Sequence, residues 1–308
     1  MIQRTFLQQL TEEGSKTMRV LAIDSSGLTA TVAVVEDEQT IAEYTVNYKK
    51  THSQTLLPMI DEVKKMIDLD LSSIDAIAVS GGPGSFTGLR IGSATAKGLG
   101  LALGKPLIHV PTVDALAYNV YGCGDLICPI MDARRKQVYT GLYSFSHEVK
   151  DGTHLTEAAF HVEEQQMAIA VEELIGKLNA YKRPVVFLGD GVPVYRQMIE
   201  EGLEVPYSFA PSYMNRQRAA VVGALGIAYY YAGKYETAEA HKPDYLRVSQ
   251  AERERAQREK EAKTEVREMT IEDGAVVAEI EHQSFSDAWS EKAILETLEQ
   301  NNSVCFVA

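Results

Sequence analysis

The segment that decides the fold reads Val79-Ser-Gly-Gly-Pro-Gly-Ser-Phe-Thr-Gly-Leu-Arg-Ile-Gly92. Its first residue, Val79, is the last of an apolar run, Ile74-Asp-Ala-Ile-Ala-Val79, of the kind that forms a buried strand. Three glycines and a proline then break the strand, and either Ser85 or Thr87 can cap the helix that follows. Glycine has no Cβ, so the backbone at this junction can come close to another group. The segment therefore predicts a strand, a tight loop and a helix in direct succession.

This glycine loop matches nucleotide-binding loops only in part. It contains no lysine, so it lacks the Gly-Lys-Ser/Thr ending of a P-loop. Gly82, Gly84 and Gly88 are spaced as G-x-G-x-x-x-G, one residue longer than the dinucleotide fingerprint. A helix N-terminus can still hold an anion, so nucleotide binding by the loop stays open.

Within the predicted helix, Gly88, Gly92, Ala96 and Gly100 lie four residues apart and form one row. A glycine in a helix interior costs about 1 kcal/mol relative to alanine, so close packing must offset the cost of this row. Two explanations stay open: the row contacts another chain, or it packs on the protein's own sheet. If it contacts another chain, Gly92→Leu is expected to block docking while the free chain stays folded.

The rest of the chain up to residue 248 predicts two similar lobes. The first half reads as three short strands, a helix, a strand and a second helix; the ranges are 19–24, 29–36, 40–47, 52–68, 74–80 and 85–104. The second half loosely repeats this pattern, with a hairpin, a helix, a strand and a helix at 127–131 with 137–145, 168–178, 184–188 and 216–231. Meandering strands followed by helix and strand indicate mixed-sheet α/β lobes, and their similarity suggests an internal duplication.

Composition excludes several classes of protein. The chain has 308 residues, 45% of them apolar and 24% charged, as in globular proteins. No apolar run is long enough to predict a transmembrane helix or a membrane partner. Three cysteines cannot form a disulfide framework, which favours the cytoplasm. The net charge of −13 argues against a protein that grips nucleic acid by itself, so a partner would hold any nucleic acid.

Shifts in composition divide the chain into five parts. Residues 1–17 are polar and form an extension, and residues 18–113 and 114–248 form the first and second lobes. The stretch 251–268 is rich in charges of both signs, which predicts a helical linker over 249–264. Residues 265–308 have the composition of a globular segment again.

Four segments together resemble the TsaB (YeaZ) family: Val20-Leu-Ala-Ile-Asp-Ser-Ser26, Thr51-His-Ser-Gln-Thr-Leu-Leu-Pro58, the run from Ser80 to Gly92, and Pro243-Asp-Tyr-Leu-Arg247. The resemblance covers about 18–248. It implies the two-lobed actin-like ATPase fold, which belongs to the ASKHA superfamily and is RNase H-like. It also implies a subunit of the bacterial machinery that makes N6-threonylcarbamoyladenosine (t6A) at position 37 of tRNAs reading ANN codons.

The resemblance further implies partners rather than cofactors. The subunit would bind the catalytic paralogue TsaD and, through the complex, the ATPase TsaE and tRNA; without its partner it would form a homodimer. ATP, ADP and metal are expected on TsaD and TsaE, and no cofactor is expected on this chain alone. The implied contact uses two helices of the first lobe, with interface residues His52, Leu56, Ser85, Phe86, Thr87, Gly88, Leu89, Gly92, Ala96 and Gly100.

The active paralogue holds a metal with two histidines on one helix turn, and this chain departs from that pattern. The matching stretch, Val110-Pro-Thr-Val-Asp-Ala-Leu116, has Thr112 and Leu116 at the two positions. Leucine cannot ligate a cation, and neutral threonine is a poor substitute for imidazole. His52 alone makes an incomplete metal site. We therefore expect no catalytic residue and no metal site, and no enzymatic activity from the chain by itself.

Two further segments keep alternatives open. Asp24, Ser25 and Ser26 stand at the first-strand turn, where actin-like ATPases contact phosphate or Mg²⁺; they could retain a nucleotide contact or only hydrogen-bond within the turn. The basic segment 132–136 could contact RNA or merely connect a hairpin. An autonomous actin-like small-molecule kinase is the alternative function, but no second phosphate loop of the acid-Gly-Thr type occurs near residues 127–135.

The segment 265–290 resembles the start of RimI-type N-acetyltransferases of the GNAT fold. The resemblance implies a first strand, a helix with Val276, Val277 and Ile280 facing inward, and a strand beginning near Val304. A full-length fusion would acetylate the N-terminal alanine of ribosomal protein S18 with acetyl-CoA. The chain ends at Ala308, before the glycine-rich turn that grips the cofactor, so we expect a truncated fusion that does not bind acetyl-CoA.

Overall fold

The computed structural model describes residues 17–149, 156–246, 258, 266–285, 287–300 and 304–307. The chain divides into two compact units, residues 1–247 and 248–308. The predicted extension (1–17) and charged linker (249–264) lie outside the described residues, except for Thr17 and Arg258. No helix in the described ranges is long and apolar enough to span a membrane.

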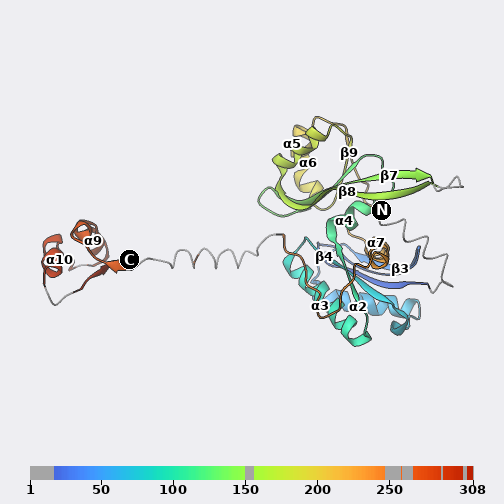
Figure 1. Ribbon diagram of the computed structural model, residues 1–308, viewed down its shortest axis with the longest axis horizontal. Coiled ribbons are helices and arrows are strands. Elements are labelled where there is room, and N and C mark those ends of the chain that lie inside the picture. Colours follow the sequence, from blue (N-terminus) through green and yellow to red (C-terminus); the bar gives the residue numbers. More distant parts are fainter. Residues whose placement is uncertain are drawn as a thin grey trace. The chain divides into compact units, whose positions relative to one another are not determined.

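The first sheet contains β1 (Arg19–Asp24), β2 (Ala30–Glu36), β3 (Gln39–Val46), β4 (Ala76–Gly82) and β5 (Leu107–Pro111), in the order β3-β2-β1-β4-β5. Its first three strands pair antiparallel, whereas β1, β4 and β5 are parallel. Helices α2 (His52–Met66) and α3 (Phe86–Leu103) cover one face, and α7 (Ala219–Tyr231) covers the other (Figure 1). The alternation of side chains along β1 explains both layers, since Val20 and Ala22 face α7 while Leu21 and Ile23 face α2 and α3.

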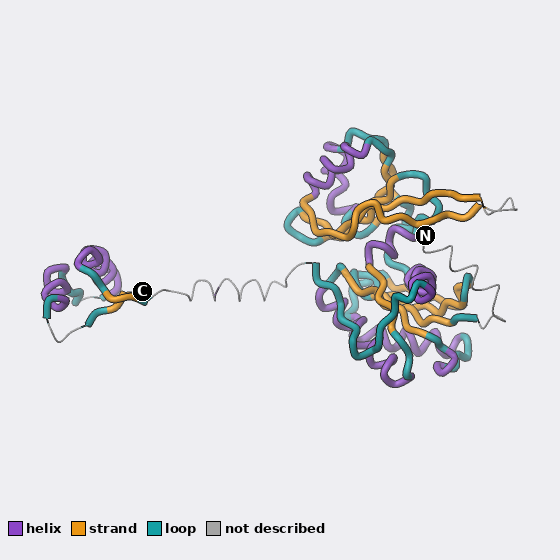
Figure 2. The backbone as a smooth tube through the Cα atoms, viewed as in Figure 1, coloured by secondary structure: helices purple, strands orange, loops and turns teal. Residues whose placement is uncertain are grey.

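The second sheet repeats this topology. Its strands are β6 (Leu126–Asp132), β7 (Gln137–Val149), β8 (Thr156–Ala170), β9 (Val185–Leu188) and β10 (Tyr207–Phe209), in the order β8-β7-β6-β9-β10. The two long strands β7 and β8 run side by side as orange tubes in Figure 2. Again the first three strands are antiparallel and β6, β9 and β10 are parallel. Helices α5 (Val171–Tyr181) and α6 (Val192–Gly202) cover one face, and α4 (Thr112–Tyr118) covers the other. The predicted two-lobed actin-like fold is confirmed, and the suggested duplication is visible as a repeated strand order.

Several elements of the second lobe differ from the sequence prediction. Residues 168–170, predicted to begin a helix, end β8, and the helix runs over Val171–Tyr181. Four elements of the second lobe were not predicted, namely α4, β8, α6 and β10, and in the first lobe β5 was not predicted either. The central part of β8 reads Glu163-Glu-Gln-Gln166, which has no apolar alternation, so its strand conformation comes from pairing with β7.

After β10 the chain returns to the first sheet. The predicted division into lobes at 18–113 and 114–248 placed this part of the chain in the second lobe, and that placement is wrong. Helix α7 packs on β1 and β2, and Glu236 bridges back to Leu107 of β5. The buried carboxylate of Asp114 in α4 joins the two lobes, since it accepts hydrogen bonds from Tyr143 Oη of β7 (2.7 Å) and Tyr229 Oη of α7 (2.9 Å). Burial raises the pKa of Asp114, and the two tyrosine hydrogen bonds partly offset that rise.

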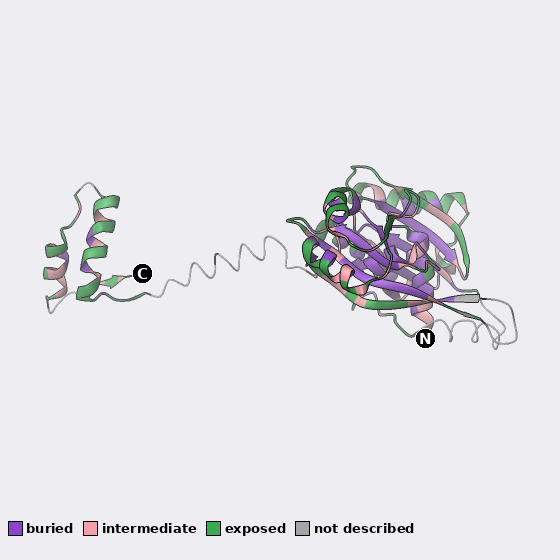
Figure 3. Cartoon of the chain, turned by 90° about the horizontal axis from the view of Figure 1, so that it is seen from above, coloured by how far each residue is buried: buried purple, intermediate pink, exposed green. Residues whose placement is uncertain are grey.

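The second unit is small and has its own core. It contains β11 (Arg267–Glu268), a 3-10 turn (Ile271–Asp273), α9 (Gly274–Ser284), α10 (Glu291–Leu298) and β12 (Phe306–Val307), and β11 pairs antiparallel with β12. Met269, Ala278 and Ile294 form the core, and much of the surface around it is exposed (Figure 3). The inward orientation predicted for Val276 and Ile280 is wrong, because these residues are 61% and 57% exposed. Gly274 and Ala278 occupy the face of α9 that packs inward, and the two side chains project from another face.

The substitution Asp114→Ala is expected to destabilise the first unit by about 2–5 kcal/mol, because it leaves two buried tyrosine hydroxyls without their acceptor. Urea unfolding of the variant and the unaltered chain measures the difference. Tyr229→Phe is the control, since it keeps the ring, removes one hydrogen bond, and should cost only about 1 kcal/mol. Equal midpoints for Asp114→Ala and the unaltered chain would show that the carboxylate does not join the lobes.

Candidate functional site

The glycine-rich junction between β4 and α3 packs directly against the turn that follows β1. Ser85 caps α3 by accepting a hydrogen bond from Gly88 N (3.3 Å), and its own N–H donates to Ser26 O (2.6 Å). A Cβ at Gly84 would collide with Ser26 O, and one at Gly88 with Ser25 O. These two glycines therefore allow the start of α3 to contact the backbone of the turn.

The residues Asp24, Ser25 and Ser26 form a buried hydrogen-bonded turn. Asp24 Oδ1 accepts from Ser26 N (2.8 Å) and Ser26 Oγ (2.7 Å), and Asp24 Oδ2 accepts from Ser80 Oγ (2.6 Å). Ser25 Oγ donates to Gly88 O (2.9 Å). Burial raises the pKa of Asp24, and the serine hydrogen bonds partly offset that rise. Hydrogen bonding within the turn thus accounts for these residues, and the nucleotide contact stays a prediction.

A cavity of about 420 Å³ lies beside this turn, at the junction of the lobes. The first lobe contributes Ser26–Leu28, Gly84 and Ser85; the second contributes Met131–Arg134, Tyr139 and Asp190. Asp132 N donates to Asp190 Oδ1 (3.2 Å), and burial raises the pKa of Asp190. Only Ser26 and Ser85 of the predicted site residues line this cavity.

The second-lobe wall of the cavity is a hairpin connection between β6 and β7. Arg134, Arg135 and Lys136 have positive φ angles of 66°, 56° and 55°, and Arg134 pairs with Asp132 at 3.1 Å. Glycine is the residue best suited to such left-handed conformations, so three larger residues in a row are unusual in this connection. The charged groups of this wall are the carboxylates of Asp132 and Asp190 and the guanidinium of Arg134, a set that suits a polar ligand.

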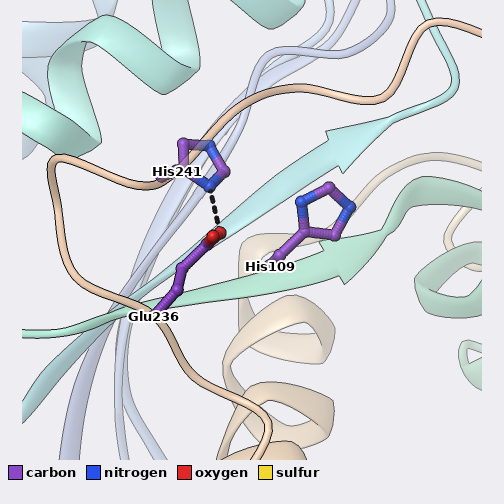
Figure 4. A group of neighbouring side chains, drawn as sticks. All are labelled: His109, Glu236 and His241. Atoms are coloured by element: carbon purple, nitrogen blue, oxygen red, sulfur yellow. Dashed lines mark hydrogen bonds and ion pairs between the residues drawn. The ribbon is translucent and has the colours of Figure 1, made fainter.

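A second cluster joins residues that are far apart in the sequence. His109 on β5 and Glu236 and His241 in the segment after α7 place potential metal-ligating atoms within 4.8 Å of one another (Figure 4). His241 Nδ1 lies 2.8 Å from Glu236 Oε1, and its Nε2 lies 3.0 Å from Ser93 Oγ. Burial lowers the pKa of His241, although Glu236 opposes that shift. No motif predicted this cluster, since at least 127 residues separate His109 from the other two.

Comparison with known proteins identifies the family. A family model described as "TsaD: tRNA N6-adenosine threonylcarbamoyltransferase" matches residues 39–255. The "tRNA threonylcarbamoyladenosine biosynthesis protein TsaB" of Bacillus subtilis is 34% identical over 237 residues, which cover 76% of this chain and 96% of that protein. The chain belongs to the TsaB family. Escherichia coli TsaB is 36% identical over 129 residues, or 41% of this chain and 55% of that protein. The structure of YeaZ from Pseudomonas aeruginosa matches with a TM-score of 0.58 and 25% identity, over 74% of this chain and 100% of that one.

In this TsaB family member, the small-residue row of α3 packs within the chain. Gly88, Gly92, Ala96 and Gly100 are buried, and a Cβ at Gly100 would contact the Leu107 side chain of β5. Packing on the chain's own sheet is the alternative that the sequence left open. A Cβ at Gly92 would lie 2.5 Å from Ser25 Oγ, so Gly92→Leu is expected to disturb the packing of the free chain as well as any docking. The partner-interface role of α3 stays a prediction.

The exposed residues of the predicted interface lie at the start of α3. Phe86 is 37% exposed and packs on Tyr245, with 4.9 Å between ring centroids, and the Arg90 guanidinium lies 4.4 Å from the Phe86 ring. Thr87 is also exposed, whereas Leu89 is buried. On α2, His52 Nε2 donates a hydrogen bond to Gly27 O (2.8 Å), and Leu56 is 1% exposed in the core.

Thr112 and Leu116 face the interior rather than a site. Both belong to α4 and are buried, and Leu116 contributes to the core of the second lobe. Thr112 Oγ1 lies 3.4 Å from Ser80 Oγ. Thr112 and Leu116 are thus a hydrogen-bonded hydroxyl and a packed aliphatic side chain, and their correspondence to the paralogue's histidines stays a prediction.

The substitution Gly88→Ala is expected to destabilise the protein by at least about 2 kcal/mol, since its Cβ collides with a backbone carbonyl that cannot move away. Gly98→Ala on the same helix is the matched control, because no atom lies within 4 Å of its Cβ position. It should stabilise the protein by up to about 1 kcal/mol through helix propensity. Thermal unfolding measures both, and a stabilising Gly88→Ala would refute the close contact.

Proposed function

We propose that this chain acts in the cytoplasm as a non-catalytic TsaB-type subunit that binds and activates a TsaD-type transferase. The product is N6-threonylcarbamoyladenosine at position 37 of tRNAs reading ANN codons. The observation that carries the proposal is the similarity to Bacillus subtilis TsaB, which spans 96% of that protein. A TsaE-type ATPase and tRNA join through the complex, in keeping with a net charge of −13 that disfavours direct binding of RNA.

The absence of catalysis is supported by the chemistry of the described residues. Thr112 and Leu116 offer no imidazole at the positions that hold metal in the paralogue. The carboxylate of Asp24 accepts three hydrogen bonds inside a buried turn. The subunit therefore acts by binding, which stabilises the competent conformation of its partner. Any nucleotide or catalytic metal belongs to TsaD and TsaE.

The docking surface that we propose consists of Phe86, Thr87, Arg90 and Tyr245. An aromatic pair with an arginine on a rigid helix start is the composition of interface hot spots, because such side chains bury much area at low entropic cost. Ser85, the residue before Phe86, is also exposed. In the absence of TsaD, the same surface would join two copies of this chain.

The test is reconstitution of t6A formation with purified TsaD, TsaE, tRNA and threonylcarbamoyl-AMP. We expect modification only when this chain is added, and none from this chain alone. Phe86→Glu should lower complex formation and t6A yield at least about tenfold, since it removes the aromatic anchor of the surface and puts a carboxylate in its place. Pull-down with TsaD and nucleoside analysis of the tRNA measure the two effects.

Val194→Glu is the matched control, because Val194 is a 56% exposed apolar residue on α6 in the other lobe. Its binding and t6A yield should equal those of the unaltered chain. Full activity of Phe86→Glu would refute the docking surface but not the non-catalytic role. Transfer of threonylcarbamoyl to tRNA by the isolated chain would refute the non-catalytic role, and phosphorylation of a small molecule would favour the kinase alternative.

We also propose that residues 265–308 belong to a RimI-like GNAT domain. The order strand, helix, helix, strand in β11, α9, α10 and β12 supports this proposal, together with a separate small core. The described part of this segment contains no glycine-rich turn between a strand and a helix that could grip a pyrophosphate. Acetyl-CoA is therefore expected to leave the thermal midpoint of this chain unchanged, and a clear rise in scanning calorimetry would contradict that expectation.

A further inference from the structure

We propose that His109, Glu236 and His241 form a binding site for a divalent transition-metal cation of the Zn²⁺ type, separate from the cavity between the lobes. The site would fasten the segment after α7 to β5 of the first sheet. The inference goes beyond the proposed function and does not depend on it.

The three side chains converge from two segments. His109 lies in the middle of β5, whereas Glu236 and His241 come from the segment after α7, which pairs with this strand at Leu107 (Figure 4). Two imidazole nitrogens and one carboxylate oxygen, each within 4.8 Å of the others, match the donor set of zinc sites with three protein ligands. Tetrahedral bonds of about 2.0–2.1 Å put ligand atoms roughly 3.4 Å apart, so shifts of about 1 Å would complete the site.

In each histidine, the ring nitrogen that points away from Glu236 has an oxygen partner nearby. His241 turns Nδ1 toward Glu236 and places Nε2 on Ser93 Oγ. One ring nitrogen of His109 is turned toward Glu236 (Figure 4), and its Nε2 lies 3.3 Å from Asp244 Oδ2. That Nε2 is buried and makes no hydrogen bond among the described residues, so a small rotation of Asp244 would complete the pair. Oxygen partners on the outer nitrogens are what orient histidine ligands in metal sites.

The protons of the cluster can also rearrange to accommodate a cation. An ionised Glu236 only accepts, so His241 carries its proton on Nδ1 and accepts from Ser93 at Nε2. When a cation binds Nδ1, the proton moves to Nε2 and Ser93 becomes the acceptor, so the ring stays neutral. Glu236 and Asp244 supply two negative charges against the charge of a divalent cation. The nearby Lys97 ammonium is occupied by the carbonyl oxygens of Glu239 and His241 (3.0 Å each).

A cation can reach this cluster from solvent. The side chains of His109 and Glu236 are 23% and 32% exposed, whereas that of His241 is fully buried. Glu236 also lines a depression of about 380 Å³ beside the end of α3. The His109 ring lies flat on Gly81, where a Cβ would collide with it, so the site adjoins the glycine-rich junction. Metal binding would therefore stiffen the loop that carries Tyr245.

The test titrates Zn²⁺ into the full, tag-free chain after chelator treatment and dialysis, with calorimetry as the readout. We expect one saturable Zn²⁺ per chain and a higher thermal midpoint in its presence. His109→Gln and Glu236→Gln should each weaken binding more than about a hundredfold, and the outer variant Asp244→Asn about ten- to hundredfold. Both altered ligands are partly exposed, and circular dichroism checks that the variants fold.

His147→Gln and Glu239→Gln are the matched controls, because both residues are exposed and lie outside the cluster. Their Zn²⁺ affinity should equal that of the unaltered chain. On the unaltered chain, Co²⁺ should give the intense visible absorption of a tetrahedral site, and X-ray absorption should show only nitrogen and oxygen ligands. Absence of saturable binding, or equal binding by His109→Gln and Glu236→Gln, would overturn the proposal and leave the cluster as a hydrogen-bonded clasp.

Discussion

The structure depends on a backbone contact between the turn after β1 and the first two turns of α3. Gly84 and Gly88 permit this contact, Ser85 fastens it through Ser26 O, and Ser25 returns a hydrogen bond to Gly88 O. Asp24 stabilises the turn from inside the protein. Because these groups satisfy one another, hydrogen bonds within the protein account for the turn at Asp24–Ser26.

The two lobes are held together by groups that belong to neither sheet alone. Asp114 accepts hydrogen bonds from tyrosines of both halves, and α7 leaves the second lobe to cover the first sheet. The cavity between the lobes is walled on the second-lobe side by Asp132, Arg134 and Asp190, and Asp190 stands between Gly189 and Gly191.

The segment after α7 contributes residues both to the histidine cluster and to the proposed docking surface. It supplies Glu236 and His241 to the histidine cluster, Asp244 to His109, and Tyr245 to the exposed pair with Phe86. The side of α3 that carries Ser93 and Lys97 contacts this segment. A cation bound by the cluster would thus act on the same loop that forms part of the proposed docking surface.

The sequence by itself determined β1 to β4, α2 and α3 of the first lobe closely, because these elements carry strong local signals: continuous apolar runs in β1 and β2, the Ser85 cap, and the glycine junction before α3. It did not predict β5 or the return of α7 to the first sheet. Only the tertiary structure decided the strand conformation of the polar β8, the inward direction of the Gly88–Gly100 row, and the meeting of His109 with His241. These features arise from contacts between residues far apart in the chain, and local pattern carries no information about which distant groups will be neighbours.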